Sequence, residues 1–256
     1  MKIGLVLSGG GIRGIAHLGV LQALTEAGIK FDKISGTSAG SIVGSLFSQG
    51  LEPYEILQIF LRTRLFKFLR PAFGNTGLLS LDLSRSLFLK YLPHDSFEGL
   101  KIPMVITATD FSAGKLVYFS SGKLVQAILA SSSIPGIFKP VMIGEKMYVD
   151  GGLLNNFPIE PLKNDCDFII GSSCNHLPVV DKIVNFRKLI ERATIMSINA
   201  DMEMKCQLCD VLIEPEGMGA TNIFEVKKAE EIYWLSYNAA LRKLQEDPKL
   251  QEIIKR

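Results

Sequence analysis

A serine with a glycine two places before it and another two places after it is the feature best suited to chemistry. Residues 36–40 read Gly-Thr-Ser-Ala-Gly. They fit the G-x-S-x-G pattern of a nucleophile elbow, a tight turn that presents a serine between a strand and a helix. Residues 31–35 have the composition of a short strand, and residues 39–49 carry apolar side chains at helical spacing. The pattern therefore predicts Ser38 as a nucleophile, with glycines where larger side chains would collide with neighbouring elements.

A glycine-rich loop at residues 9–14, Gly-Gly-Gly-Ile-Arg-Gly, follows a strand-like run and opens a helical pattern. It formally satisfies the dinucleotide-binding pattern, but that site also needs an acidic residue at the end of the second strand, where the elbow lies. Consecutive amides at a helix N-terminus equally suit an oxyanion hole. The helix dipole disfavours Arg13 in a first turn by ~0.3–1 kcal/mol. We therefore expect Arg13 to meet a carboxylate or an anionic ligand, with a salt bridge to a surface acid as the simpler alternative.

A serine nucleophile needs a base, and the three histidines are poorly placed to supply one. His17 should face the core or a neighbouring helix, and His94 should lie in an exposed loop. His176 follows a predicted strand, so a triad in the order Ser38, Asp150, His176 remains an alternative. Asp150 is the preferred base, because it ends an apolar strand and precedes two glycines. A direct contact of ~2.6–3.2 Å between the two side chains would make a Ser-Asp dyad, although Asp-Gly-Gly also occurs as a plain turn.

Strand and helix signals alternate along the chain, which predicts an α/β fold with a mostly parallel sheet covered on both faces. Strands are expected at 2–8, 31–35, 102–109, 115–120, 141–149, 168–173 and 211–214. Helices are expected at 15–27, 39–49, 52–70, 82–92, 123–130, 184–206 and about 222–245, with a loop at 71–81. Sites in such folds form beyond the carboxyl ends of the strands, where the glycine loop and the elbow both lie.

Composition narrows the class of protein. The 256 residues fit one sizeable α/β domain, and a net charge of +2 gives no bulk electrostatic case for nucleic acid. No apolar run reaches the ~20 residues of a spanning helix, and the start of the chain lacks a signal peptide, so we expect a cytoplasmic protein. Cys206 and Cys209 are three positions apart in a C-x-x-C pattern, but no second ligand pair accompanies them. We read them as incidental thiols and expect no metal and no cofactor.

The glycine loop, the elbow and Asp150-Gly151-Gly152, in this order, resemble the patatin-like phospholipase family. The resemblance is to its bacterial members, which are similar to the neuropathy target esterase catalytic domain. The stretch Ala130-Ser-Ser-Ser-Ile-Pro-Gly-Ile-Phe138 is similar to a further segment of the family. Acyltransferases of a related fold carry histidine before the nucleophile, where this chain has Thr37. The resemblance covers about residues 1–215 and leaves a C-terminal helical part, about 216–256, within the single domain expected for 1–256.

The resemblance implies a three-layer α/β/α sandwich and a serine esterase that hydrolyses lipid acyl esters, such as phospholipids or lysophospholipids, through an acyl-enzyme. It implies Ser38 as nucleophile and Asp150 as base. It implies an oxyanion hole formed by Gly9, Gly10 and Gly11, with Arg13 close by. No metal is implied.

A lipid substrate raises the question of membrane contact. Residues 59–70 mix bulky apolar and basic side chains, which suits peripheral contact with an anionic inner membrane, although an ordinary lid or packing helix is an equal alternative. Two other functions remain open at this stage. One is a non-catalytic lipid-binding or regulatory protein on the same scaffold, and the other is a nucleotide-binding protein built on the glycine loop.

Overall fold

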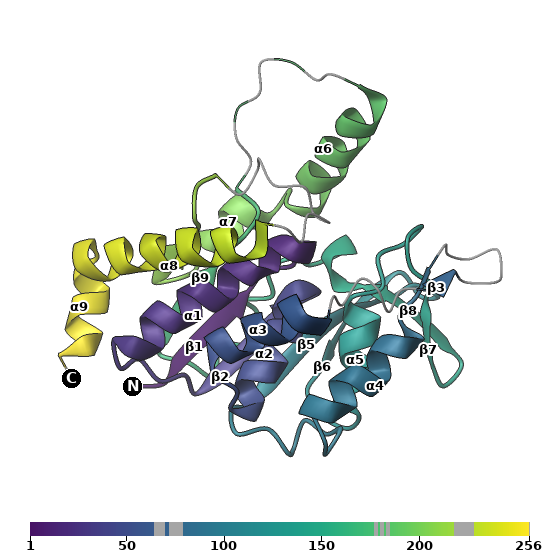
Figure 1. The fold of residues 1–256 in the computed structure, drawn as a ribbon, viewed down its shortest axis with the longest axis horizontal. Coiled ribbons are helices and arrows are strands. Elements are labelled where there is room, and N and C mark those ends of the chain that lie inside the picture. The colour runs from purple at the N-terminus through teal and green to yellow at the C-terminus, as the bar shows by residue number, and fades with distance from the viewer. Residues whose placement is uncertain are drawn as a thin grey trace.

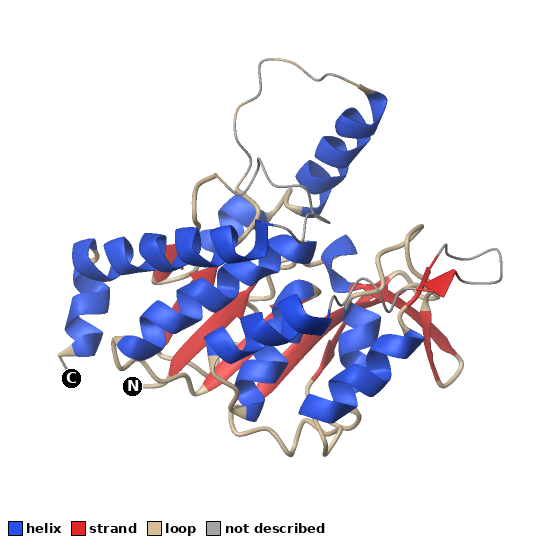
Figure 2. Cartoon of the chain, viewed as in Figure 1, coloured by secondary structure: helices blue, strands red, loops and turns tan. Residues whose placement is uncertain are grey.

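The computed structural model describes residues 1–63, 70–71, 79–176, 179, 182, 185–217 and 228–255. Within them, one open mixed sheet is flanked by helices, which Figures 1 and 2 show in the same view. The sheet contains β1 (Ile3–Leu7), β2 (Lys33–Thr37), β5 (Met104–Asp110), β6 (Lys115–Phe119), β7 (Val141–Ile143), β8 (Lys146–Asp150), β9 (Phe168–Ser172) and β10 (Val211–Ile213). The helices are η1 (Gly11–Ile15), α1 (Ala16–Glu26), α2 (Ala39–Gln49), α3 (Pro53–Thr63), α4 (Asp82–Tyr91), α5 (Leu124–Ser131), η3 (Gly151–Leu153), α6 (Phe186–Ile198), α7 (Met202–Cys206), α8 (Ala229–Glu246) and α9 (Pro248–Ile254).

The parallel part of the sheet runs β10-β9-β1-β2-β5. At β5 the sheet changes direction, because β6 and β8 both pair with β5 antiparallel, and β7 then pairs with β8 antiparallel. The predicted α/β class with a mostly parallel sheet is thus confirmed, and the antiparallel strands form one side of it.

The strand β5 positions the ends of two other strands. Its residues 106–110 pair with β6 along one edge. On the other edge, Thr107 pairs with Thr37 at the end of β2, and Ala108 pairs with Asp150 at the end of β8. Because β2 and β8 run toward each other along this edge, their last residues lie at neighbouring positions of β5.

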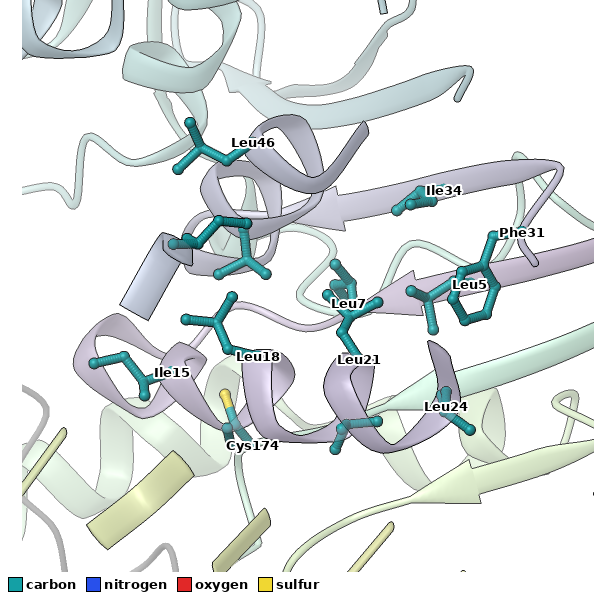
Figure 3. Packing of buried hydrophobic residues seen from close by; sticks show 14 of the residues in the cluster. Leu5, Leu7, Ile15, Leu18, Leu21, Leu24, Phe31, Ile34, Leu46 and Cys174 are labelled. Atoms are coloured by element: carbon teal, nitrogen blue, oxygen red, sulfur yellow. The ribbon is translucent and has the colours of Figure 1, made fainter. Parts of the chain in front are cut away.

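The two faces of the sheet are covered differently. Side chains of a strand alternate between faces, so Leu5 and Leu7 of β1 lie on one face and Val6 on the other. The first face packs against α1, α2 and α8 in the main core, part of which Figure 3 shows with Leu18, Leu21 and Leu24 of α1. The second face carries a smaller cluster formed by Val6, Phe157, Ile159, Leu162, Ile169 and Met202. An irregular segment at about 155–166 and the short α7 therefore pack against this face.

Several predicted boundaries were wrong. The single strand expected at 141–149 is a hairpin, β7 and β8, whose turn contains Gly144 at φ 62°. The long helix expected at 184–206 is interrupted between α6 and α7 around Asn199, whose side-chain amide donates to the carbonyl of Ile195. The strand expected at 31–35 begins at Lys33 and continues through Gly36 and Thr37, because β1 and β5 both pair with Gly36 and β5 also pairs with Thr37.

Two more expectations concern regions that the structure describes only in part. The helix expected at 52–70 ends at Thr63 as described, and Arg70–Pro71 forms a short strand, β3, that pairs with β4 (Leu79–Ser80). The remaining parts of this region, 64–69 and 72–78, and the expected helix start at 222–227 lie outside the described residues. The expected C-terminal helix is confirmed from Ala229, while the separate α9, with Asp247 as its N-cap and Pro248 in its first turn, was not predicted.

Candidate active site

Ser38 occupies a strained turn between β2 and α2. Its backbone has φ 51° and ψ −118°, a conformation that costs a non-glycine residue of order 1–3 kcal/mol. A Cβ added to Gly36 would lie 2.6 Å from the carbonyl oxygen of Gly40, and one added to Gly40 would lie 2.4 Å from that of Leu7. The two glycines are therefore required by close backbone contacts, as the sequence pattern predicted.

The hydroxyl of Ser38 donates a hydrogen bond to Asp150 Oδ2 at 2.6 Å. The second carboxylate oxygen, Oδ1, accepts from the amide of Gly152 at 2.7 Å. Both side chains are largely buried, since Ser38 and Asp150 are each 7 % exposed. Ser38 follows the last residue of β2 and Asp150 is the last residue of β8, so their meeting follows from the two strands converging on β5.

The electrostatics of the pair favour a base that titrates near neutrality. Burial raises the pKa of Asp150 to about 6, while the hydrogen bonds from Ser38 and Gly152 lower it and so oppose the shift. Desolvation disfavours the charged carboxylate, whereas donors directed at it favour the charge. Asp150 is thus a stronger proton acceptor than an exposed aspartate.

The glycine loop lies beside Ser38, since a Cβ added to Gly9 would be 3.2 Å from Ser38 Cβ. The Gly9 amide donates to the carbonyl of Asn156 at 3.1 Å. This amide is already engaged, and the expected role of Gly9 as an oxyanion donor stays a prediction. Within the described residues, the amides of Gly10 and Gly11 have no carbonyl acceptor and remain the candidate donors.

Arg13 lies inside the molecule, with only 2 % of its surface exposed. It belongs to η1, before α1 begins, and not to the first turn of the α-helix as expected. The expected pairing of Arg13 with a carboxylate or an anionic ligand, and the alternative of a salt bridge to a surface acid, both stay predictions.

Residues 131–133, which precede β7, hydrogen-bond the backbone of both Ser38 and Asp150. The sequence did not reveal this role. Ser131 Oγ accepts from the amide of Ser38 at 2.8 Å. The carbonyl of Ser133 accepts from the amide of Asp150 at 2.9 Å. The run of three serines is a visible signal, but nothing in its spacing tells which serine faces the elbow.

An apolar pocket of about 100 Å³ opens beside Ser38. Five of its lining residues, Gly11, Ile12, Gly14, Ser38 and Ala39, belong to the glycine loop and the elbow. The rest of the wall is mostly aliphatic and aromatic and consists of Ile15, Ile42, Val43, Phe60, Leu81, Ser84, Ser132, Ile134 and Phe138. The pocket can accept a hydrocarbon chain attached to a group that reacts at Ser38.

None of the three histidines is seen in contact with Ser38 or Asp150 in the described part of the chain. His17 is fully buried, donates from Nε2 to the carbonyl of Ser8 at 2.9 Å, and accepts at Nδ1 from the Ser172 hydroxyl at 2.8 Å. Burial lowers the pKa of His17 to about 4, although the Ser8 bond raises it, so the ring is neutral and joins β1 to β9. His94 is exposed, as expected. His176 Nδ1 lies 3.4 Å from Glu214 Oε2.

The next question is whether side chains in the described part of the chain could bind a metal ion or supply a reactive thiol. There, no group of three His, Cys, Asp or Glu side chains could hold a metal ion. Cys206 and Cys209 are free thiols, and burial raises the pKa of each to about 12. Among the described helices, none combines the length and hydrophobicity that crossing a bilayer requires.

The α/β sheet thus brings together a serine elbow, an aspartate in direct contact with that serine, and an adjoining glycine loop. A family model described as patatin-like phospholipase matches residues 5–163. The chain belongs to this family.

Relatives agree with that assignment. An uncharacterized NTE family protein of Mycobacterium tuberculosis is 34% identical over 177 residues, which are 68% of this chain and 49% of that protein. The lysophospholipase nte1 of Aspergillus fumigatus is 31% identical over 210 residues, which are 74% of this chain and 13% of that protein. The chain thus spans about half the length of the mycobacterial relative. VipD from Legionella pneumophila shares the fold, with a TM-score of 0.57 at 14% identity over 95% of this chain and 67% of VipD.

Proposed function

We propose that this protein is a serine hydrolase of lipid acyl esters in which Ser38 is the nucleophile and Asp150 the general base. The observation that carries the proposal is the 2.6 Å hydrogen bond between Ser38 Oγ and Asp150 Oδ2. It is supported by the strained elbow, by the apolar pocket beside Ser38, and by membership of the patatin-like phospholipase family.

In the first half-reaction, Ser38 Oγ attacks the ester carbonyl carbon and its proton passes to Asp150 Oδ2. The carbonyl oxygen gains negative charge, which the amides of Gly10 and Gly11 stabilise at the start of η1. The bond to the alcohol oxygen then breaks, and the departing alcohol takes the proton from Asp150. The acyl group remains on Ser38.

In the second half-reaction, water gives a proton to Asp150 and attacks the acyl-enzyme. Collapse of this second intermediate releases the carboxylic acid, and the proton on Asp150 returns to Ser38. No histidine takes part in either step. A triad through His176 is disfavoured, because Ser38 and Asp150 contact each other directly and His176 contacts Glu214.

The substrate class follows from the pocket and from the relatives. The pocket wall beside Ser38 is mostly apolar, which fits a fatty acyl chain better than a polar group. One relative is named a lysophospholipase, so we propose phospholipids or lysophospholipids as substrates.

A fluorophosphonate probe tests the assignment of the nucleophile. The probe phosphonylates activated serines, so it should label the wild-type protein at Ser38 and leave Ser38→Ala unlabelled. Hydrolysis of lysophosphatidylcholine should fall by at least about 10³-fold in Ser38→Ala. Ser41→Ala is a matched control, since Ser41 lies one helical turn away and bonds only the Ser38 carbonyl. Full labelling of Ser38→Ala would refute the proposal.

We also propose that the protein contacts a lipid surface peripherally. The basic and apolar segment first suspected, 59–70, lies partly outside the described residues. The support comes instead from α6, which carries a stripe of exposed apolar side chains: Phe186, Leu189, Ile190 and Met196. Figure 1 shows α6 standing beyond the edge of the sheet toward which β1 and β2 run. Ser38 follows β2, so α6 stands beyond the same edge as the proposed active site.

A further inference from the structure

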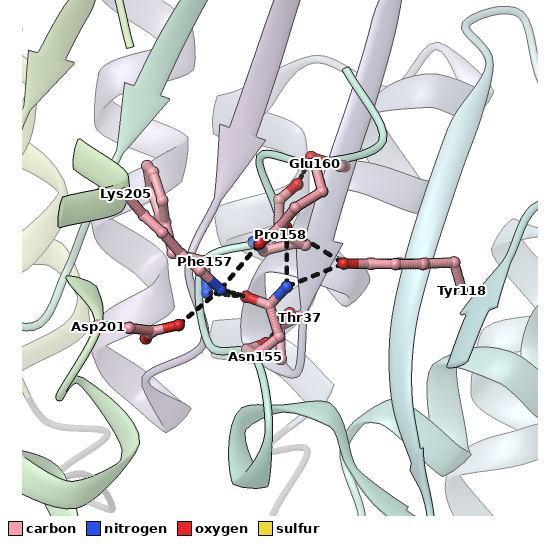
Figure 4. A network of polar contacts seen from close by, with 9 residues as sticks. Thr37, Tyr118, Asn155, Phe157, Pro158, Glu160, Asp201 and Lys205 are labelled. Atoms are coloured by element: carbon pink, nitrogen blue, oxygen red, sulfur yellow. Dashed lines mark hydrogen bonds and ion pairs between the residues drawn. The ribbon is translucent and has the colours of Figure 1, made fainter. Parts of the chain in front are cut away.

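A polar cluster lies on the second face of the sheet, behind the elbow. Figure 4 shows its members, which include Lys205 and Asp201 around α7, Tyr118 of β6, and Asn155 and Glu160 of the irregular segment. Cys206 and Met202, neighbours of Lys205 on α7, pack in the apolar cluster on this face. The polar cluster therefore lies on the face of the sheet opposite the core that borders the pocket.

Lys205 is the buried charge of this cluster, with 7 % of its surface exposed. Its ammonium nitrogen donates to three oxygens, Asn155 Oδ1 at 2.6 Å, Asp201 Oδ2 at 2.8 Å and Glu160 Oε1 at 3.0 Å. An ammonium group has three donors, so every donor is used. The two carboxylates balance its charge, and both are about two-fifths exposed at 41% and 42%.

The side-chain amide of Asn155 makes four hydrogen bonds. Its Oδ1 accepts from Lys205 and from the amide of Phe157, and its Nδ2 donates to Glu160 Oε2 at 2.8 Å and to the Tyr118 hydroxyl at 3.1 Å. Because a lysine can only donate and a carboxylate can only accept, these partners allow a single orientation of the amide.

The backbone of Asn155 and Asn156 hydrogen-bonds a residue next to the nucleophile, a residue next to the base, and the glycine loop. The carbonyl of Asn155 accepts from Thr37 Oγ1 at 2.9 Å, one residue before the nucleophile. The amide of Asn155 donates to the carbonyl of Gly151 at 2.8 Å, one residue after the base. The carbonyl of Asn156 accepts from the amide of Gly9 in the glycine loop at 3.1 Å.

We propose that Lys205 is a positioning residue that holds the nucleophile, the base and the glycine loop in register through Asn155 and Asn156. This inference rests on the proposed function of Ser38 and Asp150 and extends it to the opposite face of the sheet. Lys205 does not touch the reacting atoms. It fixes Asn155, and Asn155 fixes the backbone on either side of the pair. A displacement of 1 Å in a reacting group can cost about 100-fold in rate.

Lys205→Met tests the proposal, because methionine keeps an unbranched apolar side chain, one heavy atom shorter, and removes the charge and the donors. The kcat for lysophosphatidylcholine should fall by about 10- to 100-fold, with KM within about threefold, since the substrate pocket lies on the other face. Labelling of Ser38 by the fluorophosphonate should slow in parallel. Tyr118→Phe removes one outer contact of Asn155 at a side chain that is 38% exposed, so it should fold and show a smaller loss in kcat.

Lys33→Met is the matched control. Lys33 is also a lysine with a carboxylate partner, Asp165, and a carbonyl partner, Pro161, but it contacts no residue of the active site. It should keep wild-type kcat. Unchanged kcat in a folded Lys205→Met protein would overturn the proposal, and so would equal losses in Lys205→Met and Lys33→Met.

Amide hydrogen exchange separates this inference from the proposed function. In Lys205→Met, exchange should speed up in peptides that cover Thr37 and Gly152 and stay unchanged around α8. This readout needs no turnover. If wild-type Ser38 neither labels nor hydrolyses esters, the proposed function fails, while unchanged exchange at Thr37 and Gly152 would refute the role of Lys205. If Lys205→Met does not fold, kcat and amide exchange at Thr37 and Gly152 are measured in Tyr118→Phe instead. Unchanged values of both would then refute the proposal.

Discussion

At the scale of single residues, Asp150 combines two opposing influences. Burial makes its carboxylate costly, and donors from Ser38 and Gly152 partly compensate. The result is a carboxyl group with a pKa of about 6, close to the pH at which a general base is most effective. An exposed histidine usually has a pKa in this range, and burial brings the pKa of Asp150 close to it.

The pH dependence of hydrolysis tests this reading of Asp150. Because the base must be deprotonated, kcat/KM should rise with pH through about 6 and level off above it, following the pKa of Asp150. Asp150→Asn should lose at least about 10³-fold at all pH values, since an amide cannot take the proton. His176→Ala is the control and should keep both the activity and the acid limb. Loss of that limb in His176→Ala would assign the titration to the histidine instead.

The raised pKa of Asp150 also makes the free energy of unfolding depend on pH. The folded pKa lies above the unfolded one, so the folded state binds the proton more tightly between about pH 4 and pH 6. The free energy of unfolding contributed by Asp150 is therefore largest at low pH and is lost as pH rises through 6. At pH 8 Asp150→Asn should melt no lower than wild type, which separates lost catalysis from lost folding.

At the scale of elements, α6 carries several apolar side chains that are exposed in the described part of the chain. Its exposed apolar residues recur at positions 186, 189, 190 and 196, and such spacing places them along one side of a helix. An amphipathic helix of this kind binds a membrane interface by burying its apolar side.

Vesicle co-sedimentation in the Ser38→Ala background tests this role without interference from hydrolysis. Vesicles of phosphatidylcholine with phosphatidylglycerol should bind the protein, and the double change Leu189→Glu with Ile190→Glu should weaken binding by about tenfold or more. Met142→Glu is the control, because Met142 is equally exposed at 50% but lies on β7, away from α6. Equal binding of all three proteins would contradict a role for α6.

At the scale of the whole molecule, the chain beyond the family match completes the same core. The match ends at residue 163, yet β9 and β10 extend the sheet beside β1, and Tyr233 of α8 belongs to the main apolar cluster. We therefore propose that residues 1–256 fold as a single domain.

The contact of α1 with α8 tests this unity. A Cβ added to Gly19 would lie 2.2 Å from the carbonyl oxygen of Tyr233 and 2.3 Å from Ser236 Oγ. Overpacking of this kind costs about 1–3 kcal/mol, so Gly19→Ala should lower the melting temperature by several degrees, about 2–4 °C per kcal/mol. Gln22→Ala on the same helix should change it little. Calorimetry should show one transition for both proteins, and two separate transitions would argue for independent parts.

The sequence by itself determined those features that depend on neighbouring residues. The elbow was predictable because a turn at Ser38 tolerates only glycine two places away, and α2 was predicted over its full extent, Ala39–Gln49. Asp150 was identified as the end of an apolar strand. The hairpin of β7 and β8 was missed although the polar residues 144–146 interrupt the apolar run. The break between α6 and α7 was missed because Ile195, Ile198 and Met202 keep a helical spacing through it.

Only the tertiary structure decided how these parts meet. The contact of Ser38 with Asp150 depends on β8 running antiparallel to β5, so that its last residue reaches the end of β2. The bond from Gly9 to Asn156 and the bond from Lys205 to Asn155 join segments far apart in the chain. Such pairings depend on the packing of the whole sheet, and no local spacing of residues encodes them.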